Sequence, residues 1–118
     1  MDRSRLRMDD QEVRAFLDAH RVAVLAGRDP LGAMTGRRVS YERRADTLVL
    51  TLEPAGPGLD VDAHPELCLI VDVYPGWDTG RIKGVVVQGA GRWIDRDQRI
   101  ELRLGSIVSF DFTKAARP

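Results

Sequence analysis

The sequence contains few of the residues and motifs that identify a protein's function directly. It contains one cysteine and two histidines among 118 residues, too few for an internal disulfide or for a zinc site built from protein ligands alone. No CxxC, HExxH, GxGxxG or Walker phosphate-binding motif occurs in it. No metal site is therefore expected and no side chain is assigned as catalytic, so any enzyme activity is expected to depend on an added cofactor.

The sequence also lacks an excess of positive or negative charge, and it has no long hydrophobic run. The 18 basic residues balance 18 acidic ones, and aromatic residues make up only 6% of the chain. Neither a nucleic acid nor a membrane is expected as a partner, because no net positive field attracts one and few rings are available for base stacking. The longest apolar runs, such as 22–26 and 68–71, are too short to cross a bilayer. A cytoplasmic protein is the expectation.

What is present is the composition of one globular domain, with 43% hydrophobic and 31% charged residues. We expect a flexible tail over residues 1–8 and a single domain over 9–118. Asp9 followed by Glu12 is typical of a helix N-terminal capping box. Val13, Phe16 and Leu17 then recur at helical spacing, which predicts one amphipathic helix over 10–20.

After residue 20 the hydrophobic period changes to two, which is typical of strands. Leu48, Leu50 and Leu52 alternate with polar or β-branched residues and should share one buried face. Breaker-rich segments at 29–32, 53–62 and 75–80 predict turns and loops. The expected strands cover residues 21–27, 33–43, 47–53, 67–74, 81–94, 99–104 and 107–112.

The segment 81–94 is long for a strand and contains Gly84, Gly89 and Gly91. Glycines inside a strand often mark bends or bulges where a sheet curls upon itself. One helix and six to seven antiparallel strands therefore predict a mainly β protein, a small closed β-barrel with one N-terminal α-helix.

Several local sequences, in this order, resemble the pyridoxamine 5'-phosphate oxidase-like, FMN-binding split β-barrel superfamily. The resemblance extends from about residue 12 to residue 113, nearly the whole chain. It rests on the strand VAVLA (22–26) before an Asp-Pro-x-Gly turn, on TLVLT (47–51), on GVVVQGA (84–90) and on the closing VSFDFTK (108–114). Each motif is weak by itself; their order makes the resemblance specific.

The resemblance implies a homodimer with two equivalent cofactor sites, each built at the interface from both subunits. It further implies FMN, or alternatively a deazaflavin coenzyme, and a hydride or electron transfer to a small-molecule substrate. Arg37, Arg38, Val39 and Ser40 match the segment that holds the phosphate through an arginine and the ring through backbone groups. The remaining matches are the Thr51 hydroxyl, which would contact the phosphate, and Lys83 and Gly84, which lie where the partner subunit reaches the ring.

The sequence departs from this pattern in the loop before Pro65. Relatives carry a basic residue there, whereas the segment 53–66 has four acidic residues and neither lysine nor arginine. Acidic side chains beside a phosphate are repulsive. A second interpretation therefore stays open, a split-barrel dimer that has lost its cofactor and acts as a binding or structural protein. Arg37 and Arg38 would then belong to a solvated strand edge.

Overall fold

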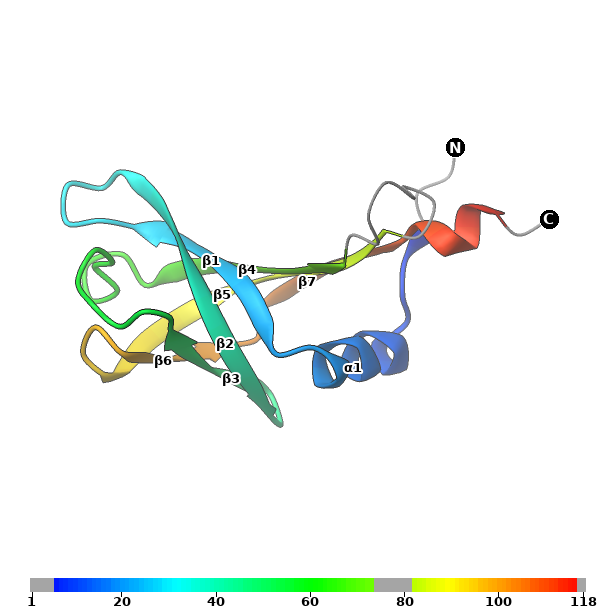
Figure 1. The fold of residues 1–118 in the computed structure, drawn as a ribbon, viewed down its shortest axis with the longest axis horizontal. Coiled ribbons are helices and arrows are strands. Elements are labelled where there is room, and N and C mark those ends of the chain that lie inside the picture. The colour runs from blue at the N-terminus through cyan, green and yellow to red at the C-terminus, as the bar shows by residue number, and fades with distance from the viewer. Residues whose placement is uncertain (1–5, 74–81, 117–118) are drawn as a thin grey trace.

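One short helix and seven antiparallel strands make up the part of the chain described by the structure, a computed structural model that covers residues 6–73 and 82–116 (Figure 1). The predicted loop at 75–80 lies outside these residues. The elements are α1 (Asp10–Ala19), β1 (Val22–Arg28), β2 (Met34–Arg44), β3 (Thr47–Leu52), β4 (Glu66–Val73), β5 (Lys83–Asp95), β6 (Arg99–Arg103), β7 (Ser106–Asp111) and the 3-10 helix η3 (Phe112–Ala116).

Six of the strands close into a barrel. The sheet order is β4-β1-β2-β3-β6-β5-β7, and an additional pairing of β4 with β5 completes the ring. Strand β7 is hydrogen-bonded to β5 but stands outside the ring. The predicted fold class, a mainly β split barrel with one N-terminal helix, is confirmed.

Strand β5 changes its neighbour half-way along its length. Its first half, Lys83–Gln88, pairs with β7, and its second half, from Gly91 onward, pairs with β6. At the crossing point a Cβ on Gly89 would lie 1.9 Å from the carbonyl oxygen of Arg103, and one on Gly105 would lie 2.6 Å from that of Gln88. Both positions therefore require glycine, because no neighbouring backbone can yield that far.

The core lies inside the barrel and beneath α1. Leu48, Leu50 and Leu52 are all buried, as their alternation predicted. Twenty-one apolar residues in the described part of the chain are buried, among them Leu25, Leu69, Val85, Val87, Ile100 and Leu102, each with no exposed surface.

Helix α1 begins with the predicted capping box. The Asp9 side chain accepts from the Glu12 amide at 2.7 Å, and the Glu12 side chain accepts from the Asp9 amide at 3.2 Å. The helix is held to the barrel by the Tyr41 hydroxyl, which donates to the Leu17 carbonyl at 2.8 Å. Met8, the last residue of the predicted tail, is buried in the core. No helix of the described residues is long and apolar enough to span a membrane.

Candidate functional site

Two neighbouring arginines of β2 have opposite orientations. Successive side chains of a strand point to opposite faces of its sheet. Arg37 lies on the face of Val39 and Tyr41, which are buried, whereas Arg38 is exposed on the outer face of the barrel. The two predicted phosphate ligands therefore cannot act together as one clamp.

Arg37 is occupied by the chain itself. Its guanidinium donates to the carbonyl oxygens of Pro54 at 2.7 Å, Pro57 at 3.1 Å and Gly56 at 3.3 Å. A charged fork that satisfies three loop carbonyls fixes the breaker-rich loop against the end of the barrel. The structure thus gives Arg37 a positioning role in the loop, and its contact with a phosphate stays a prediction.

Arg38, in contrast, makes no side-chain hydrogen bond or ion pair within residues 6–73 and 82–116. Ser40 lies on the same outer face and is opposite Thr51 in the β2–β3 register. Thr51 is in turn opposite Arg99 of β6. Directly opposed residues of antiparallel strands share a face, with Cβ atoms about 5 Å apart. We call Arg38, Ser40, Thr51 and Arg99 the outer polar row.

The outer polar row combines two guanidinium groups with two hydroxyls. Arginine forks and hydroxyl donors are the groups that proteins use to bind phosphate esters. Arg99 also contacts Asp95, whose carboxylate accepts from Nε at 2.6 Å. Arg99 was missed by the sequence interpretation, because only the pairing of β3 with β6 brings it beside Thr51.

An open hollow of about 700 Å³ adjoins Arg38. It forms where β1 and β4 part, since β1 pairs with β4 only from Val24 to Ala26. We call its apolar lining residues, Ala19, Val22, Ala23 and Val24, the floor of the hollow. The hollow is lined by Ala19, His20, Arg21, Val22, Ala23, Val24, Arg38 and Asp72. Apolar lining residues beside the guanidinium groups of Arg21 and Arg38 suit a flat organic ring that carries an anionic tail.

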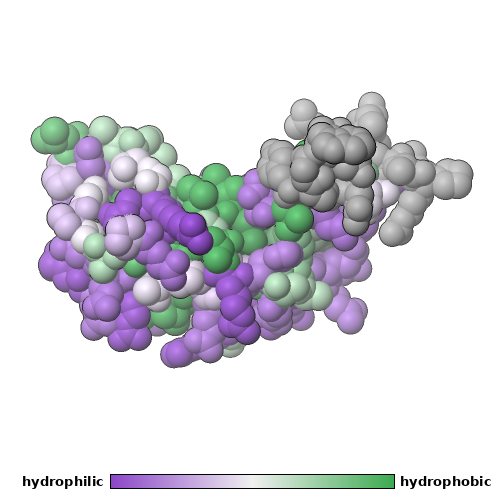
Figure 2. Space-filling model, in the orientation of Figure 1, coloured by the Kyte–Doolittle hydropathy of each residue, from purple (hydrophilic) through white to green (hydrophobic). Residues whose placement is uncertain are grey.

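The outer face continues from this hollow as an apolar surface. Val24, Ile70, Val86 and Val108 are opposite one another in register across β1, β4, β5 and β7. We call these four residues the apolar row. Val24 is 48% exposed and Val108 is 62% exposed. Figure 2 shows hydrophobic residues gathered in the middle of this side of the molecule.

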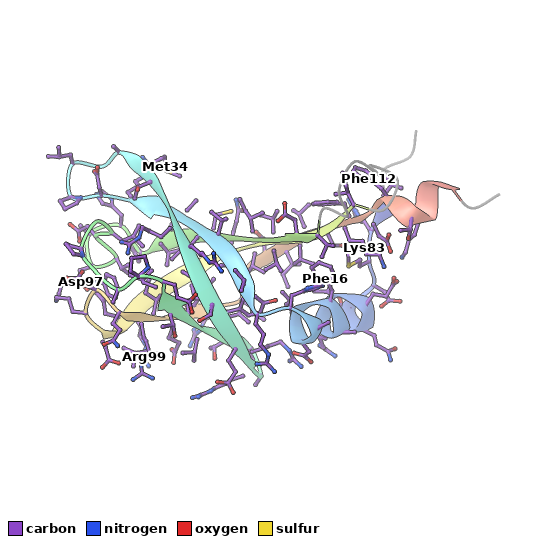
Figure 3. All side chains as sticks on the ribbon, in the orientation of Figure 1. Phe16, Met34, Lys83, Asp97, Arg99 and Phe112 are labelled. Carbon is purple, nitrogen blue, oxygen red and sulfur yellow. The ribbon has the colours of Figure 1, made fainter. Side chains whose placement is uncertain are left out.

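Lys83 and Gly84 are separated by the same alternation that separates the arginines. Lys83 points to the α1 side, where its ammonium lies 3.6 Å from the buried carboxylate of Asp111 (Figure 3). Gly84 lies on the outer face, beneath the ring of Phe110, because a Cβ there would be 2.3 Å from the Phe110 Cζ atom. Within one subunit, the structure does not bring Lys83 to the outer polar row.

Val39 is fully buried and is flanked by paired strands, with Ala23 on one side and Leu52 on the other. It therefore lies in the barrel wall and offers no free strand edge to a ring. Two further hollows, of about 510 and 570 Å³, flank α1. Neither contains a residue of the outer polar row, so the hollow beside Arg38 is the candidate site.

The acidic loop 53–66 is partly neutralised by the β5–β6 turn. Arg96 in that turn donates to the Asp62 carboxylate at 2.8 Å. This hydrogen bond, together with the charge of Asp62, raises the pKa of Arg96. The Asp60 side chain accepts from the Ala63 amide at 3.1 Å. Both aspartates thus have local partners, which lessens the repulsion expected between this loop and a bound phosphate.

Cys68 lies half-buried on the outer face, in register with Ala26 and Gln88. Burial raises the pKa of its thiol, so the thiolate is scarce at neutral pH and the group is unreactive. His20 closes α1, with its backbone amide donating to the Leu17 carbonyl at 3.4 Å.

Several solved protein structures have the same fold as this chain. The conserved hypothetical protein Rv2991 from Mycobacterium tuberculosis superimposes with a TM-score of 0.77 at 13% identity, covering 100% of this chain and 94% of that one. A protein from Corynebacterium glutamicum, provisionally described as a pyridoxamine 5'-phosphate oxidase, gives 0.63 at 10% identity, with coverages of 87% and 94%. This chain has the split-barrel fold of pyridoxamine 5'-phosphate oxidase-like proteins.

A third structure of this fold is an FAD-binding protein from Mesorhizobium loti, with a TM-score of 0.67 at 18% identity and coverages of 86% and 94%. No protein-family model matches the sequence. No curated protein matches it either. At these identities the shared fold is established, and function has to be argued from the split barrel's own residues.

Proposed function

We propose that this split barrel binds a flavin-type cofactor on its outer face, at the interface of a homodimer. FMN is the first candidate and a deazaflavin coenzyme the second. When bound, such a cofactor supplies hydride or electron transfer, here to a small-molecule substrate in the cytoplasm. The observation that carries the proposal is the free guanidinium of Arg38, which lies beside an apolar-floored hollow and on the face of two hydroxyls.

The outer polar row fits the phosphate end of the cofactor. Arg38 provides a fork of donors that is not engaged elsewhere in the described chain, and Ser40 and Thr51 provide neutral donors on adjacent strands. A phosphate partly withdrawn from water needs several such donors. The ring would lie against Val22 and Val24, whose exposed surfaces form the floor of the hollow. The chain's own residues would therefore bind and orient the cofactor.

The homodimer is supported by the exposed apolar row. A monomer that leaves an exposed apolar surface beside a ligand hollow exposes area that a partner subunit would cover. The second candidate function, a dimer without cofactor, is favoured by one observation, the absence of any lysine or arginine in the loop 53–66.

The test is an absorbance spectrum of the freshly purified protein, followed by titration with FMN and with the deazaflavin coenzyme. Binding with micromolar or tighter affinity is expected for one of them, and Arg38→Ala should weaken it at least about tenfold, since a charged hydrogen bond to phosphate is lost. Colourless protein that binds neither cofactor would withdraw the enzyme proposal and leave the cofactor-free dimer.

A further inference from the structure

The hairpin that joins β1 to β2 ends in a rigid turn. The Asp29 carboxylate accepts from the amides of Leu31 and Ala33, both at 2.9 Å. The Gly32 amide donates to the Asp29 carbonyl at 2.9 Å, and the Arg28 guanidinium donates to the Gly32 carbonyl at 2.7 Å. The turn is therefore held in one conformation by its own hydrogen bonds.

This rigid turn displays two apolar side chains to solvent. Leu31 is 94% exposed and Met34 is 62% exposed. Within the described part of the chain most of their surface is uncovered, so they add little to the stability of the barrel. Apolar side chains presented on a pre-ordered scaffold are the usual anchors of protein interfaces, because little conformational entropy is lost when they bind. We call Leu31 and Met34 the hairpin anchor.

The hairpin anchor and the apolar row lie on the same side of the molecule. Figure 1 shows the β1–β2 hairpin rising beyond the layer of β1, β4, β5 and β7, on the side away from α1. Figure 2 shows hydrophobic residues on the surface beside that hairpin. One molecule thus carries both a projecting apolar hairpin and an exposed apolar row, and a two-fold axis can bring each to its counterpart in a second copy.

We propose that the partner of the hairpin anchor is a second copy of this chain, and that each subunit inserts Leu31 and Met34 against the apolar row of the other. This inference rests on the homodimer of the proposed function and adds the element that holds it. The anchor of one subunit then also walls the cofactor hollow of its partner, since Val24 belongs both to the apolar row and to the floor of that hollow.

Charge and area favour a second copy over a membrane. The chain has no net charge, so two copies approach without long-range repulsion and an anionic bilayer exerts no net attraction. A stable interface takes about 800 Å² from each partner. That is roughly a tenth of the 7448 Å² of accessible surface, and the hairpin anchor and apolar row already expose Leu31, Met34, Val24 and Val108.

Sedimentation of the full-length wild-type chain and of Leu31→Asp, Val108→Asp and Ile94→Asp tests the proposal. Leu31 and Val108 lie in the two halves of the proposed contact, and Ile94, 40% exposed on the second half of β5, is the matched control outside both. The wild type and Ile94→Asp should be dimers. The other two variants should raise the dimer dissociation constant by about 100-fold or more, because each dimer contains the changed contact twice. Circular dichroism should show all four chains folded.

Each contrary result overturns a defined part of the inference. A Leu31→Asp variant as dimeric as the wild type, beside a dissociated Val108→Asp, would refute the hairpin anchor while leaving a dimer through the outer face. A monomeric wild type that binds FMN would refute the anchor and keep the cofactor site, whereas a dimer that needs Leu31 but binds no cofactor would refute the proposed function alone. Binding of wild-type monomer to phosphatidylserine vesicles, lost in Leu31→Asp, would assign the anchor to a membrane and overturn the proposal.

Discussion

The inner and outer faces of the same strands differ in how far the rest of the chain covers their side chains. On the inner face, alternate residues of β4 and β5 such as Leu69 and Val87 are wholly buried by the barrel and α1. On the outer face, the intervening residues leave Val24 and Val108 about half exposed, and Arg38 without a partner among the described residues. The chain therefore satisfies one face by itself and leaves the other for something else. The residues that build the core and those of the proposed site thus alternate along the same strands.

The largest effect expected from this difference concerns stability. Leu69→Ala should lower the free energy of unfolding by about 3 kcal/mol, because it leaves a cavity in the closed barrel. Val108→Ala on the outer face should change it by less than about 0.5 kcal/mol in the monomer, since a largely exposed side chain buries little area. Urea denaturation at a protein concentration that keeps the chain monomeric measures both. Equal losses for the two variants would show that the outer face is packed after all.

Replacing either of the two neighbouring arginines of β2 should have a different effect, because Arg37 holds the loop and Arg38 lies on the outer face. Arg37→Ala should cost about 1–2 kcal/mol of stability, because three loop carbonyls lose a charged donor. Arg38→Ala should leave stability nearly unchanged and act on cofactor affinity. Denaturation curves and titrations of the same two proteins separate the roles. If Arg37→Ala unfolds like the wild type while losing the cofactor, the assignment of the two arginines is reversed.

A smaller effect should appear at alkaline pH on the α1 side. Burial, with the nearby charge of Asp18, raises the pKa of Tyr41 to about 12. A raised pKa in the folded state means that the hydroxyl contributes its full stability below about pH 10, the ordinary tyrosine value, and loses it as the pH rises towards 12. Tyr41→Phe should cost about 1 kcal/mol at neutral pH. The gap between the two proteins should close between pH 10 and 12, and a constant gap would contradict this ionisation.

The smallest effect is expected at the exposed contact of Asp18 with Arg43. The Arg43 guanidinium donates to both carboxylate oxygens, at 2.7 and 2.8 Å, and this hydrogen bonding lowers the pKa of Asp18. A lowered pKa contributes stability above the ordinary aspartate value and loses it as the pH falls through the lowered one. Asp18→Asn should therefore reduce stability slightly at neutral pH and be indistinguishable from the wild type in strong acid. Urea midpoints across the acid range measure it, and a difference that grows on acidification would contradict the sign.

The fold could be predicted from the sequence because its signals are local. The alternation of Leu48, Leu50 and Leu52 states which face is buried, and Asp9 with Glu12 states where the helix begins. Each requires only neighbouring residues, and the structure confirms both. The order of the local motifs then sufficed to recognise the split barrel.

The candidate site was harder to predict because it depends on pairings distant in sequence. That Arg37 and Arg38 face opposite ways follows from strand alternation, and the buried Tyr41 could have shown which one points inward. Arg99, in contrast, comes beside Thr51 only because β3 pairs with β6. The ion pair of Arg96 with Asp62 likewise depends on how the loop folds against the β5–β6 turn. No periodicity in the sequence contains that information.

The crossing of two backbones at Gly89 and Gly105 has a consequence for how such barrels are recognised. Structures of the same fold can be as little as 10% identical in sequence to this chain, so few side chains are common to them. The fold does require the absence of a side chain at Gly89 and Gly105, because only then can β5 pass from β7 to β6. We expect a distant barrel that changes strand partners in this way to keep glycine at both positions even when every neighbouring residue differs. A search for such relatives should therefore gain more from this pair of glycines than from any conserved side chain.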